Sequence, residues 1–318
     1  LDALGNLFFR QSRYKRASTF FKFALKRIPK QEVNLTTVGR LGLTYMNLGQ
    51  HREGIALIEK HLKSEHKGRL DECALSVNLG IIQLDFGDFS GAEYNFHNGL
   101  HLSQLIGNRL YESISYGSLG GIEIIKGNSR AAYEFLEKDR EIVEQLGDKQ
   151  GQSIVLGLYG EYYLLERQPE KAREYFKAQW SQAKSLGYTK GMIKAATGLI
   201  QVGLQTQDWS AHAEATRLLP DDALGINQMS FEYHVSRFLA AAKKEETILT
   251  KEVFQNLQEM AVQLNTDLAQ FYVSWMNKYL ESQEARKALP EAFIFEQGTY
   301  SNPAYLSLNK RLMYALKS

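Results

Sequence analysis

The spacing of hydrophobic residues along the chain predicts helices. In residues 79–100, LGIIQLDFGDFSGAEYNFHNGL, apolar side chains recur at steps of three and four, as on one face of a helix. Glycines interrupt this segment at Gly80, Gly87, Gly91 and Gly99. An interior glycine costs a helix about 1 kcal/mol relative to alanine. Glycine at these positions therefore needs a reason, and the close approach of a second helix supplies one.

The same arrangement recurs at spacings of 37, 38, 40 and 40 residues. A glycine follows Leu or Tyr at Leu4-Gly5, Leu41-Gly42, Leu79-Gly80, Leu119-Gly120 and Tyr159-Gly160. Twelve residues later comes a small residue, and four residues after it a large apolar one: Ala17 and Phe21, Gly54 and Ile58, Ala92 and Phe96, Ala132 and Leu136, Ala172 and Phe176. Turn-like pairs lie between them at Gln11-Ser12, Gly49-Gln50, Gly87-Asp88, Gly127-Asn128 and Arg167-Gln168. Each unit is therefore predicted to be two short helices joined by a tight turn.

Repetition at this period is typical of a solenoid, in which each helical pair stacks on the next. Helices of about 13 to 15 residues are marginal alone, so packing must stabilise them. The small residues let paired helices approach closely, and the large residue one turn away fills the neighbouring groove. The sequence predicts an all-α fold, a right-handed α-solenoid of helix-turn-helix pairs.

The pattern resembles the tetratricopeptide repeat (TPR), whose signature has small residues at its eighth, twentieth and twenty-seventh positions. The match over residues 5–29 rests on Gly5, Phe8, Ala17, Phe21, Ala24 and Pro29. The 40-residue spacing, with linkers at 105–109 and 146–149, is similar to the longer TPR subtype of bacterial signalling regulators and spindle-orientation adaptors. The resemblance covers about residues 1–185.

We expect a TPR solenoid over residues 1–220, with five clear repeats and a degenerate sixth. The sixth has Ile200 and His212 where small residues are expected, although Asp208-Trp209 still suits the turn. Residues 221–318 keep helical periodicity without the signature, which predicts divergent helical pairs or capping helices. Asn302-Pro303 opens a last helix, at about 303–317, that caps the stack or fills a groove.

The resemblance implies a concave groove lined by the first helix of each pair, at the repeat's fifth, ninth and thirteenth positions. The predicted groove residues are Asn6, Arg10, Leu43, Asn47, Ile81, Asp85, Ile125 and Glu161. The clamp that binds chaperone tails needs lysine and asparagine at the fifth and ninth positions, and Asp2 in place of lysine argues against it. Gly39, Gly117, Gly121 and Gly157 either leave the groove floor low or serve helix packing only.

Charge is uneven along a chain whose net charge is only +2. Residues 1–70 carry 14 Lys and Arg against 5 Asp and Glu, and the remainder carries 24 against 31. A one-sided basic patch is predicted at Lys15, Arg16, Lys22, Lys26 and Arg27. A solvated edge, a dock for an acidic protein or upstream segment, and a lipid or nucleic-acid contact are the alternatives, in that order.

No motif for catalysis is found: the chain has no phosphate-binding glycine loop, HExxH, CxxC or Gly-x-Ser-x-Gly. We therefore expect no enzyme activity, no cofactor and no metal. The lone Cys73 cannot form an internal disulfide, which agrees with a reducing compartment. The chain contains no run of 18 apolar residues, so the sequence predicts no membrane-spanning helix.

The leading interpretation is a cytoplasmic scaffold that binds a partner peptide or helix in its concave groove, as part of a larger signalling or regulatory protein. The alternative is a sensor domain that binds a small peptide or metabolite and controls an attached output domain. A long open groove would favour the scaffold, and a pocket closed by residues 222–318 would favour the sensor. No nucleic acid is expected as a partner, and self-association through the terminal helices is a further possibility.

Overall fold

The computed structural model describes residues 1–27, 34–63, 68–210, 213, 219, 227–284 and 303–317. Regular structure in these ranges is helical, with no strand, which confirms the predicted all-α class. The chain divides into two compact units, residues 1–119 and 120–318, and the division falls within α7 (Arg109–Lys126). Each unit is built from helical hairpins.

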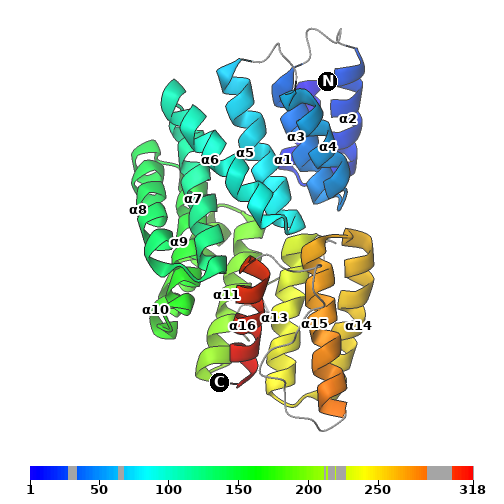
Figure 1. The fold of residues 1–318 in the computed structure, drawn as a ribbon, viewed down its shortest axis with the longest axis vertical. Coiled ribbons are helices and arrows are strands. Elements are labelled where there is room, and N and C mark those ends of the chain that lie inside the picture. Colours follow the sequence, from blue (N-terminus) through cyan, green and yellow to red (C-terminus); the bar gives the residue numbers. More distant parts are fainter. Residues whose placement is uncertain are drawn as a thin grey trace. The chain divides into compact units, whose positions relative to one another are not determined.

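The first unit holds three consecutive hairpins. Its helices are α1 (Asp2–Arg10), α2 (Tyr14–Lys26), α3 (Leu35–Asn47), α4 (His51–Leu62), α5 (Arg69–Phe86) and α6 (Phe89–Ile106). Each odd-numbered helix packs against the helix that follows it, and α3 also packs against α5 (Figure 1). The first helices of successive hairpins therefore lie side by side.

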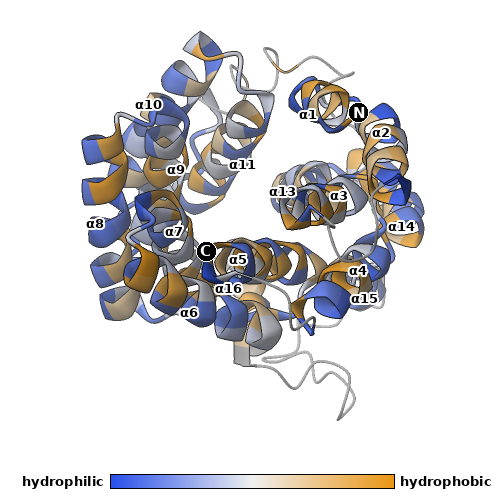
Figure 2. Ribbon diagram, turned by 90° about the horizontal axis from the view of Figure 1, so that it is seen from above, coloured by the Kyte–Doolittle hydropathy of each residue, from blue (hydrophilic) through white to orange (hydrophobic). Residues whose placement is uncertain are grey.

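The second unit repeats this plan and extends it. Its helices after α7 are α8 (Ser129–Leu146), α9 (Lys149–Leu165), α10 (Pro169–Ser185), α11 (Thr189–Thr206), α13 (Gln228–Lys243), α14 (Thr247–Leu264), α15 (Asp267–Glu284) and α16 (Pro303–Lys317). In this unit α9 and α11 form an inner layer, and α8 and α10 lie outside them (Figure 2). We call the inner side of α9, α11, α13 and α15 the inner face.

The turn inside each hairpin has one residue in the left-handed conformation, with φ from 56° to 100°. These residues are Ser12, Gly49, Gly87, Gly127, Arg167 and Glu245, and Gln207, which follows α11, has the same conformation. The first five belong to the predicted turn pairs, which confirms those turns. In the sixth repeat the left-handed residue is Gln207, one position before the predicted Asp208-Trp209 pair. Glycine tolerates this conformation without the steric cost that a side chain brings.

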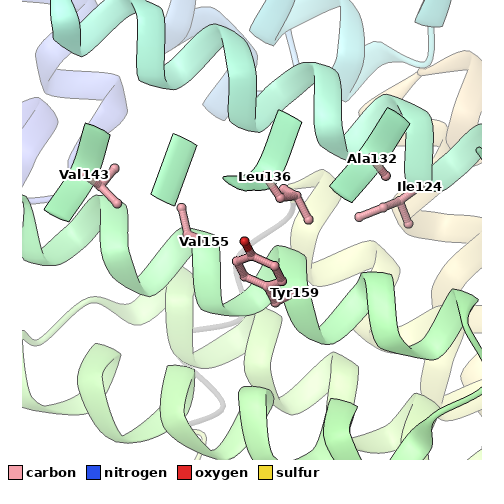
Figure 3. Packing of buried hydrophobic residues seen from close by; sticks show 6 residues of the cluster. All are labelled: Ile124, Ala132, Leu136, Val143, Val155 and Tyr159. Carbon is pink, nitrogen blue, oxygen red and sulfur yellow. The ribbon is translucent and has the colours of Figure 1, made fainter. Parts of the chain in front are cut away.

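Close approach of a neighbouring helix explains two of the glycines of residues 79–100, Gly80 and Gly99. A Cβ on Gly80 would lie 3.0 Å from the ring of Phe96, and one on Gly99 would lie 2.5 Å from Val77. The signature residues Ala17, Ala92, Ala132 and Ala172 are fully buried. Ala132 belongs to a hydrophobic core between α7, α8 and α9. Its buried residues are Ile124, Ala132, Leu136, Val143, Val155 and Tyr159 (Figure 3). Small residues recur because a neighbouring helix occupies the space beside them.

The structure describes only some of the features predicted for the C-terminal part of the chain. Ile200 is buried in α11, whereas His212 and the boundary expected at residues 220 and 221 lie outside the described residues. The division of the chain at residue 119 places that boundary within the range of the second unit. The last helix, α16, begins at Pro303 and ends at Lys317.

Candidate functional site

The predicted groove residues all lie on the first helix of a hairpin, and all are half-buried except Arg10, which is exposed. In the first unit they are Asn6, Arg10, Leu43, Asn47, Ile81 and Asp85, and in the second Ile125 and Glu161. Half-burial leaves part of each side chain accessible. Whether a partner touches them stays a prediction.

Polar groove positions of the first unit join one repeat to the next. Asp2 accepts hydrogen bonds from Asn6 at 3.0 Å and from the Thr37 hydroxyl on α3 at 2.6 Å. Asp85 on α5 lies 2.7 Å from Nε2 of His51, which begins α4 and is buried. The carboxylates of Asp2 and Asp85 thus stabilise the stacking of hairpins.

Two of the groove glycines make room for neighbouring side chains. A Cβ on Gly39 would collide with the amide of Asn78, and a Cβ on Gly157 would collide with the amide of Gln179. Both glycines are buried. Of the two alternatives for these positions, helix packing therefore applies at Gly39 and Gly157, and they do not form an open groove floor.

A row of alternating charges crosses the inner face of the second unit. Lys194 on α11 lies 3.2 Å from Glu232 on α13 and 3.7 Å from Glu161 on α9. The charge of Glu232 raises the pKa of Lys194, against the opposing effect of burial. Burial, and next the charge of Glu232, raises the pKa of Tyr272 on α15. The three charged side chains sum to one negative charge.

The C-terminal helix lies on this inner face. α16 packs against α11 and α13 (Figure 1). The buried indole of Trp275 on α15 donates a hydrogen bond to Oδ1 of Asn309 at 2.9 Å, and the rings of Phe271 and Tyr305 have centroids 5.0 Å apart. The inner face thus combines half-exposed groove positions with a helix, drawn from residues 222–318, that covers part of it.

A cavity of about 300 Å³ lies beside α16. Its lining residues are Leu164, Leu165, Arg167, Gln201, Leu204, Gln205, Leu239, Tyr272, Ser307, Leu308, Lys310, Arg311 and Leu312. Gln201 and Gln205 were not among the predicted groove residues. They stand 40 residues after Glu161 and Leu165, the ninth and thirteenth positions of the fifth repeat. The 40-residue step that places Ile200 in the sixth repeat therefore also gives Gln201 and Gln205 as groove positions, but groove residues were predicted for the first five repeats only.

A second cavity, of about 450 Å³, lies between α8, α9 and α10. Tyr133, Tyr159, Tyr163 and Tyr175 contribute aromatic walls, and the rings of Tyr159 and Tyr175 stack at 5.3 Å. Glu137 accepts hydrogen bonds from the Tyr159 hydroxyl and, at 2.6 Å, from Arg140. The bond to Arg140 lowers the pKa of Glu137, while burial raises the pKa of Tyr159. This cavity is walled by α8 and α10, which lie outside the inner layer.

The residues of the predicted basic patch are all exposed: Lys15, Arg16, Lys22 and Lys26 on α2, and Arg27 directly after it. Arg16 lies over the ring of Phe8 at 5.7 Å, and Lys22 lies over Tyr45 at 5.0 Å. Their stems therefore contribute to packing within the first unit. A partner for their charge stays a prediction.

Cys73, possible metal ligands and possible membrane-spanning helices were the remaining features to place in the described part of the chain. Cys73 is buried, and burial raises its thiol pKa to about 11, which keeps the thiol protonated and unreactive at neutral pH. Within the described ranges no three His, Cys, Asp or Glu side chains are grouped so that they could hold a metal ion. None of the helices described is both long and apolar enough to cross a membrane.

The chain matches no protein-family model and none of the curated proteins. Among solved structures it is similar to the Rap conjugation gene regulator of plasmid pLS20 in complex with the Phr* peptide, with 16% identity, a TM-score of 0.62, and coverage of 81% of this chain and 72% of that chain. It is also similar to a Rap protein complexed with competence and sporulation factor, with 9% identity, a TM-score of 0.65, and coverage of 88% and 85%. The apo form of RapI gives 14% identity, a TM-score of 0.54, and coverage of 88% and 96%. At these identities the likeness shows a shared fold: this chain has the all-α helical repeat architecture of the Rap regulators.

Proposed function

We propose that this protein is a non-enzymatic regulatory scaffold that binds a peptide or a helix of a partner protein on its inner face. The observation that carries the proposal is the placement of α16, because this surface already accepts a helix of the chain itself. Two of the similar Rap structures are complexes, one with the Phr* peptide and one with competence and sporulation factor. A peptide ligand for this chain agrees with both observations.

The chemistry of the inner face suits a peptide better than a metabolite. Leu164, Leu204 and Leu239 supply apolar contact, while Gln201 and Gln205 supply amide groups that can bond to a peptide backbone. A groove that presents apolar pockets with a few polar groups is the usual binding surface for an amphipathic segment. We further propose that the repeats belong to the longer TPR subtype, that the protein is cytoplasmic, and that the chain is part of a larger signalling protein.

The test is selection of peptides from a displayed random library on the full chain, followed by affinity measurement with two variants. Gln201→Trp fills the cavity beside α16, while Gln258→Trp makes the same change at an exposed position of α14. Selected peptides should bind Gln258→Trp like the unmodified chain and Gln201→Trp about tenfold more weakly, which corresponds to about 1.4 kcal/mol. Peptides that bind both variants equally, or a selection that retains none, would overturn the proposal.

A further inference from the structure

We propose that α16 is a resident ligand of the inner face that an external peptide must displace, and that this peptide is an amphipathic segment with an aromatic residue, leucine-like residues and a basic residue. The inference rests on the proposed function and adds both a regulation and a chemical class of partner. Its evidence lies in where α16 packs, which side chains hold it, and which charges it meets.

The position of α16 differs from that of the other helices that follow a first helix. α10 packs against α9 and α14 packs against α13, so each completes a hairpin with the helix before it. α16 follows α15 and contacts it through Tyr305 and Asn309, but it also packs against α11 and α13, the first helices of two earlier repeats. It therefore lies across several repeats, as a bound peptide would, and does not extend the stack.

The side chains that hold α16 follow the spacing of a helix bound in a groove. Tyr305, Leu308, Asn309 and Leu312 stand at i, i+3, i+4 and i+7, and all four are buried. Tyr305 packs on Phe271, and Asn309 accepts the hydrogen bond from Trp275. These contacts define what an external ligand needs: an aromatic ring, two apolar side chains and an acceptor between them.

Charge adds a fourth requirement. Glu161, Lys194 and Glu232 together carry one negative charge, and the half-buried Arg311 of α16 lines the cavity. Arg311 also lies near Tyr272, whose pKa is raised by burial and by Glu232 and lowered by Arg311. Arg311 thus opposes the charge of Glu232 at Tyr272, and a ligand that replaced α16 would need a cation to do the same.

The fit of α16 is incomplete, which makes displacement feasible. A cavity of about 300 Å³ remains beside Leu308 and Leu312, so part of the inner face has no partner atoms. A peptide that fills this space gains contacts that α16 does not make. Because α16 belongs to the same chain, it competes with an external ligand at an effective concentration on the order of mM. The apparent affinity of the external ligand is its intrinsic affinity multiplied by the fraction of chains whose inner face is vacant.

The experiment uses the full chain and, as its probe, a fluorescently labelled synthetic peptide with the sequence of residues 303–317. The variant Leu308→Asp/Leu312→Asp removes two apolar anchors of α16 and leaves the inner face unchanged. The matched control is Ile248→Asp/Val262→Asp, which places the same two charges at exposed apolar positions of α14, with exposed fractions of 85% and 80%. Anisotropy measures peptide binding, and amide hydrogen exchange measures protection of α11, α13 and α16.

The probe should bind the Leu308→Asp/Leu312→Asp chain about tenfold or more tightly than the unmodified chain and the control, with protection lost in residues 303–317 and kept in α11 and α13. Asn309→Ala, a milder change that removes only the acceptor for Trp275, should shift both measurements in the same direction by a smaller factor; it decides the question if the double variant loses protection throughout the unit. Unchanged protection of α16 in both variants would overturn the inference, as would release of α16 without a gain in probe binding. If library peptides still bind the inner face in that last case, the proposed function stands and only the role of α16 is wrong.

Discussion

Asp85 and Gln205 occupy the thirteenth position of their repeats, one in each unit, and only Gln205 lines a cavity. Asp85 bonds to the buried His51 of the preceding hairpin, so its carboxylate holds two repeats together. Gln205 stands 120 residues later in the same register; its amide also donates to the carbonyl oxygen of Leu164 in the preceding repeat, at 3.3 Å, and its side chain lines the cavity beside α16. One repeat position can thus serve stacking alone in one unit, and both stacking and the lining of a cavity in another.

The difference shows why repeat register alone does not identify a binding surface. The first unit uses its polar groove positions, such as Asp2 and Asp85, for hydrogen bonds between hairpins. The second unit joins hairpins through Lys194 and its two acidic neighbours, and it leaves Gln201 facing a cavity. If this contrast is correct, substitutions at matched positions should affect stability in the first unit and binding in the second.

The largest expected effect tests whether the units unfold separately. Phe176 is buried between Gly160 of its own repeat and Gly198 of the next, so Phe176→Ala should lower the free energy of unfolding of the second unit by about 3 to 5 kcal/mol. Phe96→Ala, at the matched position in the first unit, is the comparison. Hydrogen exchange should rise in α9 to α11 for Phe176→Ala and in α5 and α6 for Phe96→Ala. Exchange that rises throughout the chain for both variants would show a single cooperative unit.

The next largest effect is a pH dependence of stability that we expect in the second unit, because it contains His234. Burial, with a smaller contribution from Arg237, lowers the pKa of His234 in α13 from 6.5 to about 4. Between pH 6.5 and pH 4 the His234 imidazole binds a proton in the unfolded chain but not in the folded one. The free energy of unfolding is therefore highest above pH 6.5 and falls as the pH drops toward 4, by at most about 3 kcal/mol. Urea unfolding followed in the second unit from pH 7.5 to pH 4.5 measures the loss. His234→Gln should remove this part of the pH dependence, and an unchanged pH profile would contradict the assignment.

Removal of the Asp85 carboxylate should have a moderate effect on the first unit. Asp85→Ala leaves Nε2 of the buried His51 without this partner and should cost about 1 to 3 kcal/mol of stability. Asp85→Asn keeps an oxygen at the same place and should recover much of the loss. Thermal and urea denaturation of the full chain, followed by exchange in α3 to α5, measures both. Equal stability of all three chains would mean that the pair does not hold the repeats together.

The smallest expected effect on stability belongs to the accessible groove positions. Gln201→Ala should change the free energy of unfolding by less than about 0.5 kcal/mol, because no packed core surrounds its side chain. Its effect should appear in peptide binding instead. Ile81→Arg, at a half-buried groove position of the first unit, is the comparison and should leave binding on the second unit intact. Loss of binding on Ile81→Arg, with stability retained, would show that the ligand also uses the first unit.

The sequence predicted the local features of the fold because they depend on neighbouring residues. The left-handed turns at Gly87 and Gly127, and the packing of Phe96 on Gly80, follow from the size and position of small residues within one hairpin. The start of α16 at Pro303 follows from the preference of proline for the first turn of a helix. Each of these signals lies within one repeat or one helix.

The parts that the sequence did not predict join residues far apart in the chain. His51 and Asp85 are 34 residues apart, as are Trp275 and Asn309, and no periodic pattern pairs a histidine with an aspartate or an indole with an amide. The sequence left open whether Gly39 forms groove floor or serves helix packing, because it does not show that Asn78 occupies the space beside it. The eight predicted groove residues remain predictions as contacts, since only a bound partner can show which of them it touches.

The left-handed glycines that end successive hairpins also govern how such a chain can change length. Gly107, Gly147 and Gly187 stand 40 residues apart and share nearly the same φ, from 63° to 68°. Deletion of residues 148–187 would join Gly147 directly to Tyr188 and return every later turn to its place. A deletion two residues shorter would turn the following helix by about 200°, because each helical residue rotates the chain by about 100°. Gene rearrangements in this stretch should therefore survive mainly as whole multiples of one hairpin.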